Sequence, residues 1–259
     1  MVPTALFQVF GVERKMRHIP QMKLEVRSMC QYDCEMCAHG EQRKLLKKYE
    51  LSLEDLQRFL DATRESGYFV DNMRIHGPGE PLLWHHFNEG VQMLKASGVV
   101  GTVFVATNGL LLHKISEEAW ACIDEMRVSV YGPFDRFDTL NEVKARYPDK
   151  VHINKAEEFR VLPPPGAEAP IPCACWCDGP MLLGDRLFLY CGPPVFAAAK
   201  DMGRDAMEDP ELSVTVGPNY LDAVDPTKFG NLEYCKRCWA NGNFQLETAP
   251  QKTTGGNWK

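Results

Sequence analysis

Three cysteines near the start of the chain have a spacing that suits an iron–sulfur cluster. Cys30, Cys34 and Cys37 follow the pattern C-x3-C-x2-C, directly after a short predicted strand over 22–27. Three thiolates can hold three irons of a [4Fe–4S] cluster and leave the fourth iron open, whereas clusters that only transfer electrons usually have four protein ligands. Zinc is the alternative, although structural zinc sites generally join two separated pairs of ligands. An open iron would allow a reacting molecule to bind.

Two further predicted strands end in turns that could position such a molecule. The strand over 73–76 runs into Gly77-Pro78-Gly79-Glu80-Pro81, and the strand over 102–107 ends at Asn108. With these turns the chain resembles the radical S-adenosylmethionine (radical SAM) family. In that family the three-cysteine loop follows the first barrel strand, and a Gly-Glu-Pro sequence closes the second. The resemblance covers most of residues 23–133.

The resemblance implies S-adenosylmethionine as a cofactor. In the family its methionine end binds the open iron, and an electron from an external reductant such as flavodoxin or ferredoxin releases a 5′-deoxyadenosyl radical that removes hydrogen from the substrate. A carboxylate such as that of Glu80 can accept a hydrogen bond from the α-ammonium group. Asn108 and Ser129 are explained equally well as turn-forming residues at strand ends. The residues that the resemblance assigns to cofactor binding are Met36, Gly77, Gly79, Glu80, Asn108 and Ser129.

The order of predicted elements indicates the fold. Amphipathic helices are predicted between the strands; the first begins at Ser52, which can cap a helix, and ends at Gly67. A helix between successive strands favours parallel βαβ units. The last two strands are expected over 151–154 and 159–162. We therefore expect an α/β fold, a truncated partial (βα) barrel of about six strands, with the active site at the C-terminal strand ends.

A proline-rich linker, 163–172, is predicted to separate the barrel (1–162) from a small C-terminal domain (173–259). A β-hairpin is predicted over 182–189, with a two-residue Gly-Asp turn. One cysteine before a hairpin, one after it and a distant CxxC pair resemble the twitch domain, a short form of the SPASM domain. The resemblance implies an auxiliary [4Fe–4S] cluster held by Cys173, Cys191, Cys235 and Cys238.

The first ligand of the auxiliary cluster has competing candidates. Cys175 is the alternative to Cys173, while Cys177 leaves little chain to fold back before the hairpin. Zinc bound by Cys173, Cys175, Cys235 and Cys238 is a further alternative. Cys175 or Cys177 could instead return a hydrogen atom to a substrate radical, as in radical enzymes that invert a stereocentre, or be a packed thiol without a chemical role. Arg160, on the last predicted strand, is a candidate substrate contact, with a surface salt bridge as the alternative.

The composition excludes several classes of function. The chain has 259 residues and a formal net charge of −6, so a broad basic surface for nucleic acid is not expected. No apolar run approaches the roughly 20 residues that a membrane span needs, and residues 1–15 do not have the pattern of an export signal. Clustered cysteine spacings suit metal binding in a reducing cytosol rather than disulfides. We therefore expect a cytoplasmic protein.

The expected function is that of a radical SAM enzyme acting on a small polar molecule, sugar-like or cyclitol-like. The size of the chain and its single auxiliary cluster resemble the twitch-containing dehydrogenase of aminoglycoside biosynthesis, which implies oxidation of an alcohol to a ketone. The alternatives within the family are epimerisation, with a free cysteine as hydrogen donor, and modification of a ribosomally made peptide. Outside the family, the alternative is a non-catalytic electron carrier or a zinc-binding interaction protein.

Overall fold

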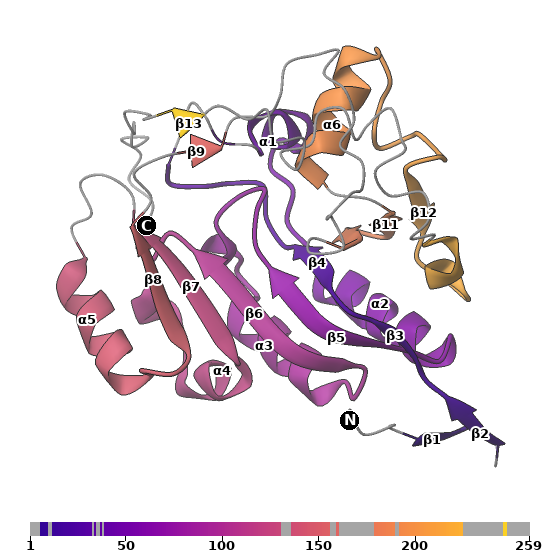
Figure 1. Ribbon diagram of the computed structural model, residues 1–259, viewed down its shortest axis with the longest axis horizontal. Helices are drawn as coiled ribbons and strands as arrows, with labels where there is room; N and C mark the ends of the chain where they lie inside the picture. Colours follow the sequence, from indigo (N-terminus) through magenta and orange to yellow (C-terminus); the bar gives the residue numbers. More distant parts are fainter. Residues whose placement is uncertain are drawn as a thin grey trace.

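The fold is a mostly parallel β-sheet with helices packed on one face, as Figure 1 shows for the computed structural model. The structure describes residues 6–9, 12–32, 34, 37, 39–130, 136–155, 159–160, 179–189, 192–224 and 246–247. This architecture confirms the predicted α/β class and partial barrel. Its central parallel strands lie side by side in chain order: β4 (Met22–Glu25), β5 (Tyr68–Ile75), β6 (Val100–Thr107), β7 (Glu125–Val130) and β8 (Val151–Lys155).

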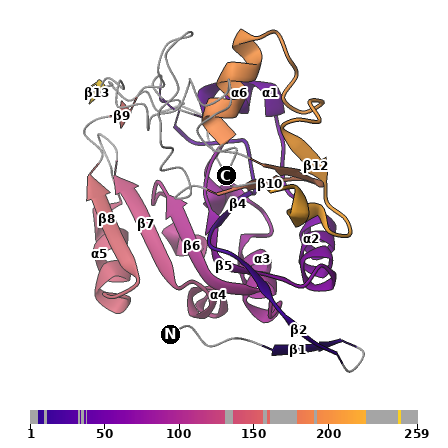
Figure 2. The ribbon, with the colours of Figure 1, turned by 45° about the vertical axis from the view of Figure 1, so that its right-hand side comes forward.

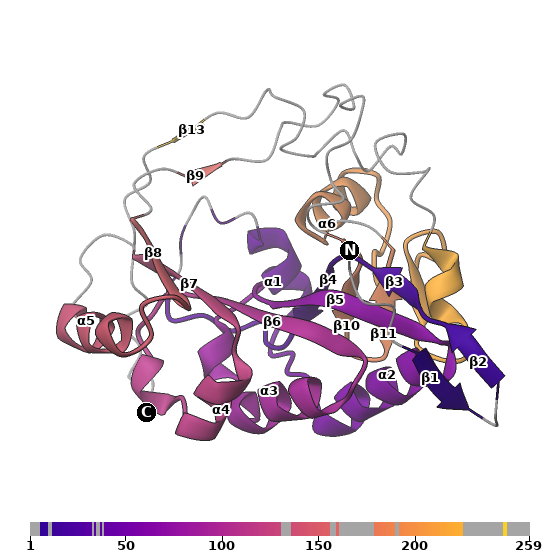
Figure 3. The same ribbon diagram turned by 60° about the horizontal axis from the view of Figure 1, so that its bottom comes forward.

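The crossovers between these strands contain the predicted helices. The Ser52 side chain caps the first of them by accepting a hydrogen bond from the Asp55 backbone N–H (3.0 Å), and Ser116 caps a later one in the same way. Figure 3 shows three of these helices beneath the sheet and the fourth beside β8. The helices are α2 (Leu53–Glu65), α3 (Phe87–Ala96), α4 (Glu117–Cys122) and α5 (Phe137–Arg146).

Alternation along the strands gives the sheet two different faces. Successive side chains of a strand point to opposite sides of a sheet. One face packs against the helices and is mostly apolar. Its buried side chains include Met22 and Leu24 of β4, Met73 and Ile75 of β5, Val103 and Val105 of β6, and Met126 and Val128 of β7. The residues between them face the opposite side, where most of them are polar or charged.

The prediction that a strand over 159–162 continues the barrel is wrong. The observed strand β9 (Phe159–Arg160) pairs antiparallel with β13 (Leu246–Glu247) and not with β8. Figure 3 shows this pair lying apart from the sheet. The reason is chain length: β8 ends at Lys155, and a parallel neighbour needs a crossover of about a dozen residues or more.

The predicted hairpin is present, but its first strand extends the barrel sheet. β10 (Met181–Leu183) and β11 (Arg186–Phe188) pair antiparallel around a turn in which Gly184 has a φ of 61°. β10 also pairs in parallel with β4, with Leu182 opposite Leu24. β11 continues the sheet to β12 (Ser213–Thr215). A further parallel strand of the sheet, next to β4, therefore comes from beyond the proline-rich segment.

Several elements were not predicted. The helix α1 (Gly40–Leu46) follows the cysteine loop and lies beside α6 (Gly192–Asp201), above the strand ends in Figure 2. None of the described helices combines the length and the apolar character needed to span a membrane. The remaining short elements are β1 (Leu6–Val9), β2 (Val12–Lys15), β3 (Arg17–Ile19), η1 (Pro81–Leu83), η2 (Leu112–Lys114) and η4 (Tyr220–Ala223).

Candidate active site

A cavity of about 340 Å³ opens at the C-terminal ends of the barrel strands. The three cysteines Cys30, Cys34 and Cys37 all line it, and each is partly buried and not in a disulfide. Several of the predicted cofactor-binding residues line the same cavity, which places them together as the resemblance implied. These residues are Gly77, Gly79, Glu80, Asn108 and Ser129.

The cysteine loop is compact and suits a cluster. The Cys37 N–H donates to the Cys34 carbonyl (3.1 Å), and the Gly40 N–H donates to the Cys37 carbonyl (2.8 Å). Burial, and to a smaller extent the charge of Glu80, raise the pKa of the Cys30 thiol from 9.0 to about 12. Because iron binds thiolate, cluster assembly would release the proton from this thiol. Three thiols that line one cavity are a ligand set that fits three irons of a [4Fe–4S] cluster.

Glu80 is a buried carboxylate held by three donors. Its Oε1 accepts hydrogen bonds from the Thr107 hydroxyl (2.6 Å) and the Leu82 N–H (3.0 Å), and its Oε2 accepts one from the Asn108 N–H (2.8 Å). Burial raises the pKa of Glu80, although these hydrogen bonds oppose the shift. A carboxylate oxygen can accept two hydrogen bonds. Oε2 therefore has capacity for a further donor, such as the ammonium group that the sequence analysis assigned to it.

Gly79 brings the strand-end turn against the cysteine loop. Its N–H donates to the Arg27 carbonyl (2.9 Å), and the Glu80 N–H donates to the Met29 carbonyl (2.7 Å). A Cβ atom on Gly79 would lie 2.2 Å from the Met29 oxygen, so only glycine fits. Gly77 is similarly close to His39, whose ring would lie 2.7 Å from a Cβ atom. The glycines thus permit contact between two parts of the chain, a role that the sequence analysis had assigned to contact with the ligand.

Asn108 connects Glu80 to the cysteine loop. Its Nδ2 donates to Gln31 Oε1 (3.0 Å) and lies 3.9 Å from Cys30 Sγ, while its Oδ1 accepts from the Leu110 N–H (3.0 Å). The last contact is the turn-forming role that was the alternative explanation. Asn108 can form the turn through Oδ1 and still contact a ligand through other atoms. The contacts of Asn108 and Ser129 with S-adenosylmethionine stay predictions.

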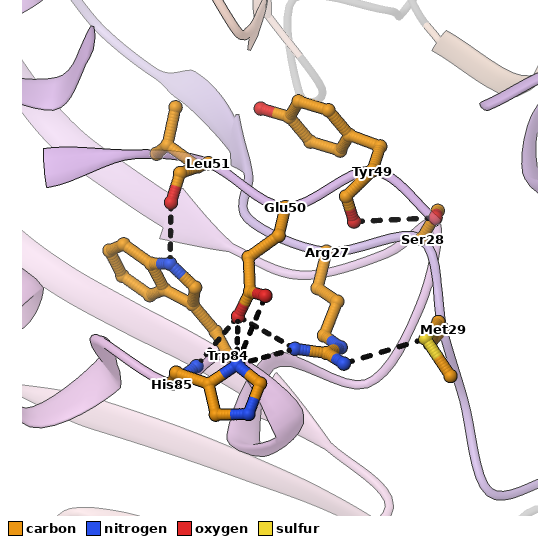
Figure 4. Close-up of polar contacts among 8 residues, drawn as sticks. All are labelled: Arg27, Ser28, Met29, Tyr49, Glu50, Leu51, Trp84 and His85. Atoms are coloured by element: carbon orange, nitrogen blue, oxygen red, sulfur yellow. Dashed lines mark hydrogen bonds and ion pairs between the residues drawn. The ribbon is translucent and has the colours of Figure 1, made fainter. Parts of the chain in front are cut away.

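The base of the cysteine loop is braced by Arg27 and Glu50, shown in Figure 4. Arg27 Nη1 donates to Glu50 Oε1 (2.6 Å), and Nη2 contacts Met29 Sδ (3.4 Å). The same Glu50 oxygen accepts from the His85 backbone N–H (2.8 Å). Burial alone would raise the pKa of Glu50, but the hydrogen bonds from His85 and the charge of Arg27 outweigh it and hold the pKa below its usual 4.5. This brace joins the first strand to the segment after the Gly-Glu-Pro turn.

The cavity also contains charged and aromatic residues that the sequence analysis did not single out. Burial lowers the pKa of His76 well below its usual 6.5, and the nearby charges of Lys23, His39 and Arg74 lower it further, so the ring is neutral at pH 7. For Lys23, Arg74, Phe104 and Arg127 the signal that could have found them is their position: they alternate with the buried apolar residues of the strands. The members of this set are Lys23, His39, Arg43, Arg74, His76, Phe104 and Arg127.

Other predicted site residues lie outside the described residues. This applies to Met36 in the cysteine loop. It applies equally to the candidates for the auxiliary cluster and the hydrogen donor: Cys173, Cys175, Cys177, Cys191, Cys235 and Cys238. Arg160 lies in β9, where the structure describes the backbone pairing with Leu246 and not the side chain. Its substrate contact stays a prediction.

The chain is similar to known proteins in sequence and in fold. No protein-family model matches the chain. The GTP 3′,8-cyclase of Alkaliphilus oremlandii is 28% identical over 102 residues, 39% of this chain and 31% of the relative. The GTP 3′,8-cyclase of Mesorhizobium japonicum is 31% identical over 109 residues, 41% of this chain and 32% of the relative. The chain thus spans about a third of the length of the curated relatives it matches.

Among solved structures, the chain is similar to BtrN in an open conformation. The match has a TM-score of 0.53 and 16% identity, and it covers 85% of this chain and 92% of BtrN. The fold is therefore shared over most of both chains. Together with the three-cysteine loop, its Gly-Glu-Pro neighbour and the similarity to the cyclases, the shared fold supports the resemblance to the radical SAM family, whose cofactors are S-adenosylmethionine and a [4Fe–4S] cluster.

Proposed function

We propose that the chain is a radical SAM dehydrogenase that oxidises an alcohol group of a small polar molecule to a ketone. The observation that carries the proposal is that Cys30, Cys34, Cys37, Glu80 and Asn108 line one cavity. Radical chemistry of this kind needs the open iron, the cofactor and the substrate within one enclosure that holds them in a reactive arrangement. The fold shared with BtrN, a dehydrogenase, supports this reaction over the alternatives.

Each residue has a distinct part in the proposal. The three thiolates would hold the cluster, and Glu80 Oε2 would accept a hydrogen bond from the α-ammonium group of S-adenosylmethionine. When bound, the cofactors supply the radical that takes one hydrogen atom from the substrate and the acceptor for the remaining electron, while the second hydrogen leaves as a proton. The acceptor in this proposal is the auxiliary cluster predicted on Cys173 or Cys175 with Cys191, Cys235 and Cys238.

The test is a turnover assay on anaerobically reconstituted protein. Reconstitution is expected to give about eight irons per chain if both clusters form. With reductant, S-adenosylmethionine and a panel of polyols and aminocyclitols, we expect 5′-deoxyadenosine and a product lighter than its substrate by two hydrogens. The Cys34→Ala variant should form no 5′-deoxyadenosine. The Cys122→Ala variant is the matched control, because Cys122 lies on α4 and does not line the cavity.

Other outcomes would change the assignment. Protein that binds about four irons and still releases 5′-deoxyadenosine would lack the electron acceptor that the dehydrogenase reaction needs. A product of unchanged mass that gains deuterium from solvent at carbon would show epimerisation instead. Absence of 5′-deoxyadenosine under strong reductant, in protein that contains the cluster and has been offered the full panel, would refute the proposed function.

A further inference from the structure

Oxidation of an alcohol to a ketone releases a proton, and a base in the cavity has to accept it. Once the substrate carbon has lost a hydrogen atom and an electron, its hydroxyl group is that of a protonated ketone, which is a strong acid. The base must therefore lie beside the reacting carbon, on the cluster side of the cavity. It must also be unprotonated at pH 7 and within reach of the substrate hydroxyl.

His76 has the position and the free ring nitrogens that this role needs. It follows directly on β5 and lines the cavity together with the three cysteines. Its side chain is only partly buried, so part of it is open to the cavity. Among the described residues, none forms a hydrogen bond with its ring. A neutral imidazole in such a place can accept a proton at one nitrogen.

The surroundings of His76 keep its ring neutral. Burial is the largest cause of the lowered pKa, and neither Glu25 at the end of β4 nor Glu80 in the turn is among the causes. The further causes, which act in the same direction, are the nearby charges of Lys23, His39 and Arg74. Because a protonated ketone is a strong acid, a base with a lowered pKa is strong enough to take its proton. The same surroundings make the imidazolium release that proton again.

Other groups in the described part of the cavity wall are less suited to this role. Glu80 already accepts three hydrogen bonds. The ring of the second histidine, His39, is held by the protein on both sides. Its Nδ1 lies 3.0 Å from Gln42 Oε1, and its Nε2 lies only 2.7 Å from where a Cβ atom on Gly77 would be. The ring of His76 has no such partners.

We propose that His76 is the base that accepts the hydroxyl proton of the substrate as the alcohol is oxidised. The inference rests on the proposed function, because it assigns a residue to one step of that reaction. The C–H hydrogen atom goes to the 5′-deoxyadenosyl radical, one electron goes to the oxidised auxiliary [4Fe–4S] cluster, and the O–H proton goes to His76 as the C=O bond forms. The rings of His76 and His39 meet edge to face at 6.0 Å, so the base lies next to the segment that follows Cys37.

The test compares 5′-deoxyadenosine with ketone in the reconstituted enzyme, using the polyol or aminocyclitol that the wild type oxidises. Hydrogen abstraction does not need the base, so His76→Gln should still release 5′-deoxyadenosine. Ketone formation should fall about a hundredfold or more, the usual contribution of a general base. The matched control is His113→Gln, because His113 is exposed on η2 and does not line the cavity. It should keep the wild-type ratio of the two products.

A second variant, His76→Ala, adds a readout that a merely structural role would not change. Free imidazole can enter the space left by the ring and accept the proton, so it should restore ketone formation in this variant. The rescue should weaken as free imidazole becomes protonated near the ordinary pKa of about 6.5. The wild type should keep its ratio of ketone to 5′-deoxyadenosine at that pH, because burial holds the pKa of His76 well below 6.5.

Two results would overturn the inference and leave the proposed function intact. One is wild-type ketone formation by His76→Gln. The other, in variants with wild-type iron content, is loss of both products together without rescue by imidazole. If the variants do not bind the clusters, the wild-type pH profile decides: a ketone ratio that has already halved at pH 6.5 on acidification would assign the proton to another base. If the wild type releases 5′-deoxyadenosine but forms no ketone from any member of the panel, the proposed function fails and this inference fails with it.

Discussion

At the scale of single residues, Glu80 serves the fold as well as the chemistry. Its two oxygens satisfy the buried N–H groups of Leu82 and Asn108 and the hydroxyl of Thr107. Such groups are costly to bury without an acceptor. The carboxylate therefore fixes the turn after β5 to the turn after β6, next to Cys30. Any loss of activity in a Glu80 variant would combine a change in ligand binding with a change in this support.

Replacing Glu80 by Gln separates these effects. In either orientation the new amide group points an N–H₂ donor at a backbone N–H, that of Asn108 or of Leu82, so one buried donor loses its acceptor. We expect Glu80→Gln to lower the free energy of unfolding by about 1–3 kcal/mol, measured by urea denaturation. The control is Glu89→Gln on the exposed side of α3, which should change stability by much less. Equal stability of the two variants would contradict the structural role.

The close approach at Gly79 gives a second prediction at this scale. A Cβ atom there would overlap the Met29 carbonyl oxygen, so Gly79→Ala must push the cysteine loop away from the turn after β5. We expect most of the iron of the first cluster to be lost on reconstitution, measured as iron bound per chain. Gly40→Ala is the control in the same loop, because a Cβ atom at Gly40 meets nothing within 4 Å. Similar iron content in both variants would show that the contact is dispensable.

At the scale of elements, the cysteine loop is held by segments that precede and follow it. Arg27 ends the extension of β4, Glu50 precedes α2, and His85 follows η1. Trp84 adds a further tie by donating from Nε1 to the Leu51 carbonyl (2.8 Å). A loop that must present three thiols to one cluster gains from such prearrangement, because the ligands are then close to their final places.

The lowered pKa of Glu50 makes the brace dependent on pH. Because its pKa in the folded chain lies below the usual 4.5, the stabilisation is complete above about pH 4.5 and is lost as the pH falls through the folded value. We expect the wild type to be more stable than Glu50→Gln at pH 7, and this difference to shrink as the solution is acidified. Urea unfolding followed by tryptophan fluorescence at several pH values measures it. A difference that does not vary with pH would mean that Glu50 titrates normally.

At the scale of the whole molecule, the C-terminal hairpin pairs with the barrel sheet and packs on its core. β10 pairs with β4, and side chains from β10, β11 and α6 belong to the same buried cluster as the barrel core. The Tyr220 hydroxyl also lies 2.7 Å from Thr63 Oγ1 of α2, so the segment around η4 is fastened to the outer layer. These contacts join the described residues of 179–224 to the barrel.

A core substitution in the hairpin should therefore destabilise the barrel. Leu182 is fully buried between β4 and β11, and Leu182→Ala is expected to reduce the free energy of unfolding by about 2–5 kcal/mol. Fluorescence of the barrel tryptophans and far-UV circular dichroism should shift together in one transition. Leu45→Ala, at a side chain that is 49% exposed, should have little effect. Two separate transitions would show that the hairpin unfolds on its own.

The sequence predicted the elements whose signals are local. Ser52 caps a helix as its type suggests, and the Gly184-Asp185 turn forms the expected hairpin. What it could not predict depends on contacts between distant segments. The pairing of β10 with β4 and of β9 with β13 is not encoded in either strand alone. Likewise, Lys23, Arg74 and Arg127 line one cavity only because the sheet brings three strands into register.

The pairing of β10 with β4 has a consequence for synthesis on the ribosome. The strand that precedes the cysteine loop emerges early, but the strand that covers its outer edge consists of residues 181–183 and emerges much later. Until then the nascent chain exposes an unpaired edge beside the unfilled thiols, where it is open to aggregation and oxidation. The surroundings of the cysteine loop are therefore completed only after residue 183 has left the ribosome.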